Sequence, residues 1–325
     1  MKRQALSRRG ALALAAFTTI APTLALAQDN RPIEWVVGYA AGGGSDVVAR
    51  TVAEQMSKTL GTTIIINNKP GAATNIAADY VAKSKDYGHV MLTADFATLA
   101  ANPFLFAKLP YNAEKDFAPV GLLARFPLIL VVATNVPVKD FKEFQAWAKA
   151  QPNGVNYASA GPGSPHHLAT EMLRERTGLK FTHVPYRGAA PAVQDLLGGQ
   201  VPFALMDSAS VQAHIAGGKL RAIGVASPAR LKTMPDIPTL AEQGLSGFEA
   251  YAWQGLVAPA GTPPDVVAKW NKALLAALDS APVKEKFQSL ALEALGGTPQ
   301  HMAEYAKTER ERWGKLITAN NIRLD

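Results

Sequence analysis

The sequence predicts an α/β protein built from two similar lobes. Stretches typical of strands and of helices alternate along the chain, which favours sheets made mainly of parallel strands. A unit of strand, glycine-rich turn and helix occurs twice, at residues 33–56 and 155–176. Between the two units, the unusually long apolar segment 120–133 is long enough to carry the chain from one lobe to the other.

The first unit begins with the β-rich run 33–39, and Val48, Val52 and Met56 then recur with the spacing of one helix face. A second strand is predicted at 63–66, a turn at 67–71, a helix at 74–82 and a third strand at 89–93.

The second unit consists of a strand at 155–158, a turn at 161–164 and a helix from 165 to 176. Three further stretches follow in order, a strand at 181–184, a helix at 190–197 and an apolar run at 203–206. The strand-like run 220–226 would return the chain to the first lobe, which the last hundred residues complete. In that part, Thr262 is predicted to cap a helix whose first residue is Pro263.

Residues 1–27 are expected to be a cleaved export signal and not part of the fold. A basic start precedes a short apolar run, and Ala25-Leu26-Ala27 offers the small residues that signal peptidase needs before Gln28. The run is shorter than the roughly 20 residues that span a bilayer. Because Arg8-Arg9 also resembles a twin-arginine signal, both export routes remain open. Either route predicts a periplasmic protein.

The composition excludes several classes of protein. The absence of cysteine removes disulfides, thiolate metal sites, cysteine nucleophiles and a lipidated cysteine anchor. Without the export signal, 29 Lys and Arg remain against 26 Asp and Glu, and no basic run is present, which argues against nucleic-acid binding. The 298 residues after position 27 suffice for a large core and two domains.

The first glycine turn is the main candidate for ligand binding. A tight turn before a helix leaves backbone N–H groups unpaired, and such groups bind anions. Gly42, Gly43 and Gly44 permit close approach of a ligand, and Ser45 adds a hydroxyl donor, which suits a carboxylate. Asp46 is expected to cap the helix or to bind a ligand ammonium. A βα turn without a ligand remains the alternative.

The second glycine turn repeats this chemistry, with Ser159, Gly161, Gly163 and Ser164 as donors facing the ligand from the other lobe. His167 would make a structural or ligand hydrogen bond. It forms no metal site with its neighbour His166, because adjacent helical residues point about 100° apart.

Two charged residues complete the candidates. Arg187 precedes a helix, and its guanidinium can bind a carboxylate through two hydrogen bonds, although a solvated surface arginine is an equal alternative. Asp207 follows an apolar run at a strand end, where open α/β sheets place their ligands, and its alternative role is a helix cap.

The sequence gives no positive sign of catalysis. No serine lies in a G-x-S-x-G motif, and no Ser/His/Asp set or carboxylate pair is recognisable from spacing. We therefore expect a binding protein without metal or cofactor. The alternatives are a secreted hydrolase or lyase acting on an acidic substrate, or a sensor that presents a solute to a membrane receptor.

Several separated segments resemble the substrate-binding proteins of tripartite tricarboxylate transporters, the Bug family. They are Arg31-Pro32-Ile33 through Ala49-Arg50, Asn67 through Ala72, Leu109-Pro110-Tyr111, Asp116 through Val120, Gly163-Ser164-Pro165-His166-His167-Leu168, Val184-Pro185-Tyr186-Arg187-Gly188, Asp195 through Val201 and Gly218 through Ala222. The resemblance covers essentially the whole mature chain.

This resemblance implies a periplasmic-binding-protein (Venus flytrap) fold, in which two lobes close on a ligand in the cleft between them. We place one lobe at 28–125 with 224–325 and the other at 126–223. The ligand would be a small carboxylate such as a di- or tricarboxylate, an acidic amino acid or an aromatic acid. The partners would be one large and one small inner-membrane transporter subunit, and the receptor would be a monomer.

The resemblance also implies the remaining site residues. The turn from Tyr39 and Ala40 to Asp46 would hold a ligand carboxylate, partly through water. The turn containing Ala73 and Thr74, and Ala189 beside Arg187, would complete the site. The family commonly has proline where this chain has Ala41, but the backbone donors are unchanged.

Overall fold

The computed structural model describes residues 31–324, so the predicted export signal lies outside the described residues. The strands are β1 (Ile33–Val37), β2 (Ile64–Asn68), β3 (Val90–Asp95), β4 (Phe117–Ala133), β5 (Val155–Ser159), β6 (Phe181–Pro185), β7 (Phe203–Asp207), β8 (Leu220–Val225), β9 (Tyr251–Pro259) and β10 (Glu293–Gly296). The helices are α1 (Gly44–Leu60), η1 (Ala72–Thr74), α2 (Asn75–Ala82), η2 (Ala97–Ala101), α3 (Asn102–Leu105), α4 (Phe141–Lys149), α5 (Pro165–Thr177), α6 (Ala189–Leu197), α7 (Ser208–Ala216), α8 (Pro264–Asp279), α9 (Ala281–Ser289) and α10 (Pro299–Ala319).

The strands form one continuous sheet that the long strand β4 divides into two parts. The order is β2-β1-β3-β9-β4-β7-β5-β6, with β10 and β8 also paired to β4. The part of β4 up to Pro127 pairs with β9 and β10, and the part from Leu128 pairs with β7 and β8. We call β1, β2, β3, β9 and β10 with the first part of β4 the first half-sheet. The remaining strands with the second part of β4 form the second half-sheet.

The sheet is mixed, so the prediction of mainly parallel strands is wrong. The βα units give parallel pairs, β1 with β2 and β3, and β5 with β6 and β7. All pairs that involve β4 or β9 are antiparallel. The strand β9, which the sequence analysis did not predict, causes much of this difference because it runs between β3 and β4. The pattern of alternating elements indicated the βα units but contained no information on which strands distant in sequence pair with each other.

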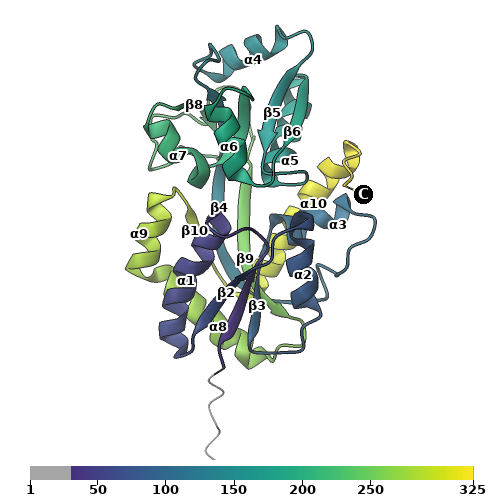
Figure 1. Cartoon of the computed structure of the whole chain (residues 1–325), viewed down its shortest axis with the longest axis vertical. Coiled ribbons are helices and arrows are strands. Elements are labelled where there is room, and N and C mark those ends of the chain that lie inside the picture. The colour runs from purple at the N-terminus through teal and green to yellow at the C-terminus, as the bar shows by residue number, and fades with distance from the viewer. Residues whose placement is uncertain (1–30, 325) are drawn as a thin grey trace, which may run out of the picture. The chain divides into compact units, whose positions relative to one another are not determined.

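Helices cover both faces of the sheet. In Figure 1, α1, α8 and α9 lie on one side of the first half-sheet, α2 and α10 lie on the other, and α4 to α7 surround the second half-sheet. The largest fully buried side chains include four tryptophans between the sheet and these helices, Trp35 on β1, Trp253 on β9, Trp270 on α8 and Trp313 on α10. The predicted helix face of Val48, Val52 and Met56 is confirmed as core, since all three are at most 1% exposed.

One predicted helix start is wrong. The helix α8 begins at Pro264 with Pro263 in the N-cap position, one residue later than expected. Thr262 therefore lies too far from the first turn to cap it, and its Oγ1 is buried without a hydrogen-bond partner among the described residues.

The two half-sheets meet in β4, close to the boundary predicted at Arg125 and Phe126. The division of the chain into two lobes nevertheless stays a prediction, because residues 31–325 form one compact unit. Within the described part of the chain, no helix combines the length and the apolar character that a membrane crossing requires.

Candidate functional site

The turn between β1 and α1 has backbone N–H groups that the protein itself does not use. Gly43 occupies the N-cap position of α1 and has no side chain to cap it. The first helical hydrogen bond joins the Val47 N–H to the Gly43 carbonyl at 3.0 Å. Within residues 31–324 the N–H groups of Gly43, Gly44, Ser45 and Asp46 have no hydrogen-bond acceptor. Four unpaired N–H groups at the positive end of a 17-residue helix form an anion-binding arrangement.

The Asp46 side chain makes its hydrogen bonds with the turn and its neighbours. Its Oδ2 accepts hydrogen bonds from the Gly42 N–H at 2.8 Å and from Arg50 Nε at 2.9 Å, and its Oδ1 accepts one from Asn68 Nδ2 at 2.9 Å. Burial acts to raise the pKa of Asp46, but these hydrogen bonds outweigh it and lower the pKa below its ordinary value. Asp46 is therefore a charged residue that stabilises the turn, and both of its carboxylate oxygens accept hydrogen bonds.

The turn before α2 lies directly beside the first turn. A β-carbon on Gly38 would lie 2.9 Å from Thr74 Cβ, so glycine is required for the two segments to pack together. Ala72, Ala73 and Thr74 all have positive φ angles, between 46° and 74°, which is unfavourable for residues other than glycine. Their environment holds this conformation: Asn102 Nδ2 donates to the Ala73 carbonyl at 2.7 Å, and the Thr74 hydroxyl is 2.9 Å from the Thr98 hydroxyl.

Three polar side chains from distant segments, Tyr39, Asp95 and Gln254, lie beside the first turn. The Tyr39 hydroxyl donates to Asp95 Oδ2, and the opposite oxygen, Oδ1, accepts from the Thr98 N–H at 2.9 Å. Burial raises the pKa of Asp95, and burial together with the Asp95 charge raises the pKa of Tyr39 well above its ordinary value. In the next strand, Gln254 Nε2 donates to Ser45 Oγ in the first turn of α1.

The turn between β5 and α5 satisfies its own hydrogen-bonding groups. Ser164 is the N-cap of α5 and accepts from the His167 N–H at 3.3 Å. The Gly163 N–H donates to His167 Nδ1 at 3.0 Å. Gly161 donates its N–H to Ser159 Oγ at 3.1 Å, and its carbonyl accepts from the Ser164 hydroxyl at 2.7 Å. The four donors that the sequence predicted for a ligand are therefore engaged within the turn.

His167 belongs to a stack of rings. Its ring lies nearly parallel to that of His183, with centroids 4.1 Å apart, and the ring of Tyr157 lies nearly parallel to both, with centroids 4.9 Å from His183 and 6.4 Å from His167. Burial lowers the pKa of both histidines to about 4. A neutral His167 is what the turn requires, because its Nδ1 must stay unprotonated to accept the Gly163 N–H.

Asp207 caps α7. Its Oδ1 accepts from the Ser210 N–H at 2.9 Å, and its Oδ2 lies 3.1 Å from His166 Nε2. Burial acts to raise the pKa of Asp207, but the hydrogen bonds from His166 and Ser210 outweigh it and lower the pKa. The sequence analysis had given this capping role as the alternative to ligand binding, and the geometry supports it.

The turn between β6 and α6 leaves N–H groups unpaired, as the β1–α1 turn does and the β5–α5 turn does not. The N-cap of α6 is Gly188, which provides no side-chain hydrogen bond, and the N–H groups of Ala189 and Ala190 have no acceptor in the described residues. Arg187 is exposed, and within 31–324 its guanidinium makes no hydrogen bond or ion pair. This turn touches the β5–α5 turn, since the Gly188 N–H donates to the Ala160 carbonyl at 3.1 Å.

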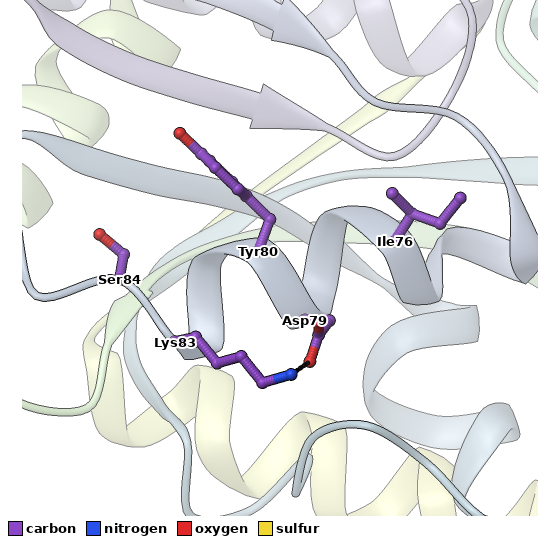
Figure 2. A pocket seen from close by; sticks show the side chains of 5 residues that line it. All are labelled: Ile76, Asp79, Tyr80, Lys83 and Ser84. Atoms are coloured by element: carbon purple, nitrogen blue, oxygen red, sulfur yellow. Dashed lines mark ion pairs between the residues drawn. The ribbon is translucent and has the colours of Figure 1, made fainter.

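A surface pocket lies apart from the predicted site residues. Figure 2 shows its lining on α2 and the two residues that follow, Ile76, Asp79, Tyr80, Lys83 and Ser84. Asp79 and Lys83 form an ion pair at 2.6 Å across one helical turn. Asp79 Oδ1 makes no hydrogen bond among the described residues beside this ion pair, and the Tyr80 hydroxyl donates to Glu34 at 2.9 Å. Ion pairs of this spacing are common on helix surfaces, so we assign the pocket no role.

Comparison with known proteins identifies the family. The model of the tripartite tricarboxylate transporter family receptor matches residues 48–322. Rpa4515 of R. palustris, solved with adipate, is 32% identical with a TM-score of 0.87, covering 91% of this chain and 100% of that chain. MatC of Rhodopseudomonas palustris, solved with malate, is 36% identical with a TM-score of 0.81 and covers 88% and 99%. The periplasmic binding protein BugD is 34% identical with a TM-score of 0.84 and covers 90% and 99%.

The chain belongs to the tripartite tricarboxylate transporter receptor family. Membership confirms the resemblance found in the sequence, and the similarity to BugD confirms the predicted fold class, a mixed α/β protein of the periplasmic-binding-protein type. The individual site residues stay predictions. The structure gathers Tyr39, Gly42 to Asp46 and Thr74 around one end of the first half-sheet, and Ser159 to His167 with Arg187 around the second.

Sequence analysis of this receptor missed Gln254 and Asp95. Each is a polar residue inside an otherwise buried strand, Gln254 at 5% and Asp95 at 3% exposure. A lone polar residue in such a strand is the signal that could have found them, because buried polar groups need a partner or a ligand.

Proposed function

We propose that this receptor captures a small carboxylate in the periplasm and delivers it to the membrane subunits of a tripartite tricarboxylate transporter. One observation carries the proposal. The four unpaired N–H groups at the start of α1 form an anion-binding arrangement in a chain whose family relatives, more than 30% identical, hold adipate and malate.

Physical chemistry favours a carboxylate at this position. The helix dipole places partial positive charge at the start of α1, and unpaired N–H groups exchange water for carboxylate oxygens at little cost. The carboxylate within the turn, Asp46, pairs with Arg50 and accepts a hydrogen bond from Asn68. The Asp95 carboxylate near the turn accepts hydrogen bonds from Tyr39 and Thr98. The turn therefore presents donors without an opposing free negative charge.

The second half-sheet supplies the other side of the proposed site. Arg187 is a free guanidinium next to the unpaired N–H groups at the start of α6, and guanidinium binds a carboxylate through two parallel hydrogen bonds. We propose that lobe 126–223 rotates against lobe 28–125 with 224–325 about the shared strands, so that both turns contact one ligand. A dicarboxylate suits one turn that offers N–H donors and another that carries a guanidinium.

The proposed partners are one large and one small integral membrane subunit, and export would depend on the signal in residues 1–27. We expect the ligand to leave the protein unchanged. A hydrolase or lyase would instead release a product, and a sensor would pass the ligand-bound state to a membrane receptor.

A thermal-shift screen of mono-, di- and tricarboxylates on the mature protein tests the proposal, with mass spectrometry of any ligand that copurifies. The expected result is an upward shift in melting temperature with dicarboxylates and recovery of the ligand intact, because binding to the folded state stabilises it. Uncharged amides of the same acids are the matched control. No shift with any carboxylate, or turnover to a product, would overturn the proposal.

A further inference from the structure

The chemistry beside the α1 turn indicates which kind of carboxylate the receptor accepts. Gln254 lies on β9 directly opposite Asp95 of β3, so the two side chains share one face of the sheet. The Gln254 amide reaches across 209 positions of sequence to the Ser45 hydroxyl, in the first turn of α1. A buried amide thus lies at the end of the helix where the ligand carboxylate is proposed to bind.

One half of this amide has no partner. Gln254 is 5% exposed, and its Oε1 is buried without any hydrogen bond among the described residues. An unsatisfied buried amide oxygen costs about 1–3 kcal/mol. A half-buried amide shows the ordinary situation: Gln243 donates Nε2 to the Ile223 carbonyl at 2.8 Å, and its Oε1 accepts from the Phe141 N–H at 2.8 Å. Gln254 is therefore half satisfied at a position next to the proposed ligand.

The neighbouring hydroxyl is oriented by the same contact. Because Ser45 Oγ accepts the hydrogen bond from Gln254 Nε2, its own proton is free to donate, and Ser45 makes no other hydrogen bond within 31–324. Beside the row of unpaired N–H donors, the protein therefore presents one more donor, the Ser45 hydroxyl, and one acceptor, Gln254 Oε1. A carboxylate uses donors alone, so the acceptor has no role with an unsubstituted acid.

We propose that Gln254 and Ser45 form a subsite for a hydroxyl group, so that the receptor selects hydroxycarboxylates over the corresponding unsubstituted acids. A ligand hydroxyl on or next to the carbon that carries the carboxylate donates to Gln254 Oε1 and accepts from Ser45. A hydroxyl also suits the reversed amide orientation, because it can donate and accept. This inference rests on the proposed function and names the ligand class of the same site.

The test compares two dicarboxylates that differ by a single hydroxyl, malate and succinate, by isothermal titration calorimetry on the mature protein. We expect malate to bind at least about tenfold more tightly, because succinate leaves the buried oxygen unpaired. Chlorosuccinate, which has a substituent at the same carbon but no proton to donate, is expected to bind no better than succinate. This arm requires no variant and cannot fail through misfolding.

The variant Gln254→Leu is expected to reduce the malate preference to about twofold or less, because it weakens malate binding more than succinate binding. The control Gln243→Leu removes a half-buried amide that is satisfied within the protein, so it lowers the melting temperature and leaves the malate preference unchanged.

Three results would overturn the inference. Equal affinities for malate and succinate would show that the ligand hydroxyl does not bind Gln254 Oε1. Equal weakening of both ligands by Gln254→Leu would show a role in supporting the turn. Tight binding of chlorosuccinate would show that size and not hydrogen bonding is recognised. If no carboxylate binds at all, the proposed function itself is wrong. If carboxylates bind without a preference for malate, the hydroxyl subsite alone is wrong.

Discussion

The turns before α1 and α5 have similar sequences, Gly42-Gly43-Gly44-Ser45 and Gly161-Pro162-Gly163-Ser164. The N–H groups of Gly43, Gly44 and Ser45 in the first turn are unpaired within 31–324, whereas those of the second turn are hydrogen-bonded within the turn. The difference depends on where the serine lies relative to the helix start. Ser164 is the N-cap of α5 and binds the first turn itself, whereas Gly43 is the N-cap of α1 and Ser45 lies two residues inside the helix. A glycine-rich turn is thus an anion site when the protein leaves its donors unused.

The largest effect is expected from Gly43→Leu. Gly43 has an ordinary extended conformation, and a β-carbon there would come no closer than 3.5 Å to another atom, so the fold accepts a side chain. The leucine would cover the unpaired N–H groups and reduce carboxylate affinity by more than about 100-fold, since several charge-assisted hydrogen bonds are lost. Calorimetry measures the affinity, and urea unfolding should show stability within about 1 kcal/mol of the wild type.

The matching substitution in the β5–α5 turn, Gly163→Ala, should lower stability and have little effect on ligand affinity. Gly163 has a φ of +74°, and a β-carbon there would lie 2.6 Å from Leu105 Cδ1. Gly163→Ala is therefore expected to cost about 1–3 kcal/mol of stability through backbone strain and overpacking. If Gly43→Leu binds ligand as the wild type does, the α1 turn is not the anion site.

The second prediction concerns pH and the stacked pair His167 and His183. The pKa of both is about 4 in the folded protein, against 6.5 for a free histidine. Below pH 6.5 the unfolded chain binds protons that the folded chain does not, so stability falls as the pH falls from 6.5 toward 4. Each histidine contributes a loss of about 2 kcal/mol at pH 5.

Urea unfolding at pH 7 and pH 5 measures this dependence. His167→Asn keeps an oxygen acceptor for the Gly163 N–H but cannot titrate, so it should remove about half of the loss. A pH dependence that is the same in this variant would show that other groups are responsible. The α1 turn has no histidine, and its binding should be less sensitive to acid than the stability of the β5–α5 turn.

The third prediction tests Arg187, which faces solvent beside the unpaired α6 turn. Arg187→Ala is expected to weaken dicarboxylate binding about tenfold, because one guanidinium–carboxylate pair is lost. Arg176→Ala, at the far end of α5, changes the net charge equally and is the control for long-range electrostatics. Equal small effects in both variants would place Arg187 outside the site.

The comparison of the two turns also shows what the sequence can predict. The βα units were predicted correctly because their buried faces repeat with clear periods, as in Val48, Val52 and Met56. The strand β9 was missed and the sheet was expected to be mainly parallel, because the pairing of β9 with β3 and β4 joins segments more than 100 residues apart. Strand order is a tertiary property that no local pattern encodes.

The site follows the same rule. The donors at Gly43 to Ser45 could be predicted from the turn alone. The self-satisfied β5–α5 turn could not, because which residue caps a helix depends on the residue at which the helix begins. Gln254 and Asp95 come from strands remote in sequence, and the tertiary fold alone brings them under α1.

The smallest effect is expected from exchanging each serine for alanine. Ser164→Ala removes the side-chain cap of α5 and should cost about 1 kcal/mol of stability. Ser45 caps nothing, but Ser45→Ala would leave the buried Gln254 Nε2 without its acceptor and should also cost about 1 kcal/mol of stability. Unlike Ser164→Ala, it should in addition weaken ligand binding by removing one donor.

Urea unfolding and calorimetry on both variants separate the two roles. If Ser164→Ala weakens ligand binding while Ser45→Ala leaves it unchanged, the assignment of the two turns is reversed, and the sequence similarity that suggested one shared function for them would be the better guide. Weaker binding in Ser45→Ala alone would show that a shift of two residues in the helix start turns a capping serine into a ligand donor.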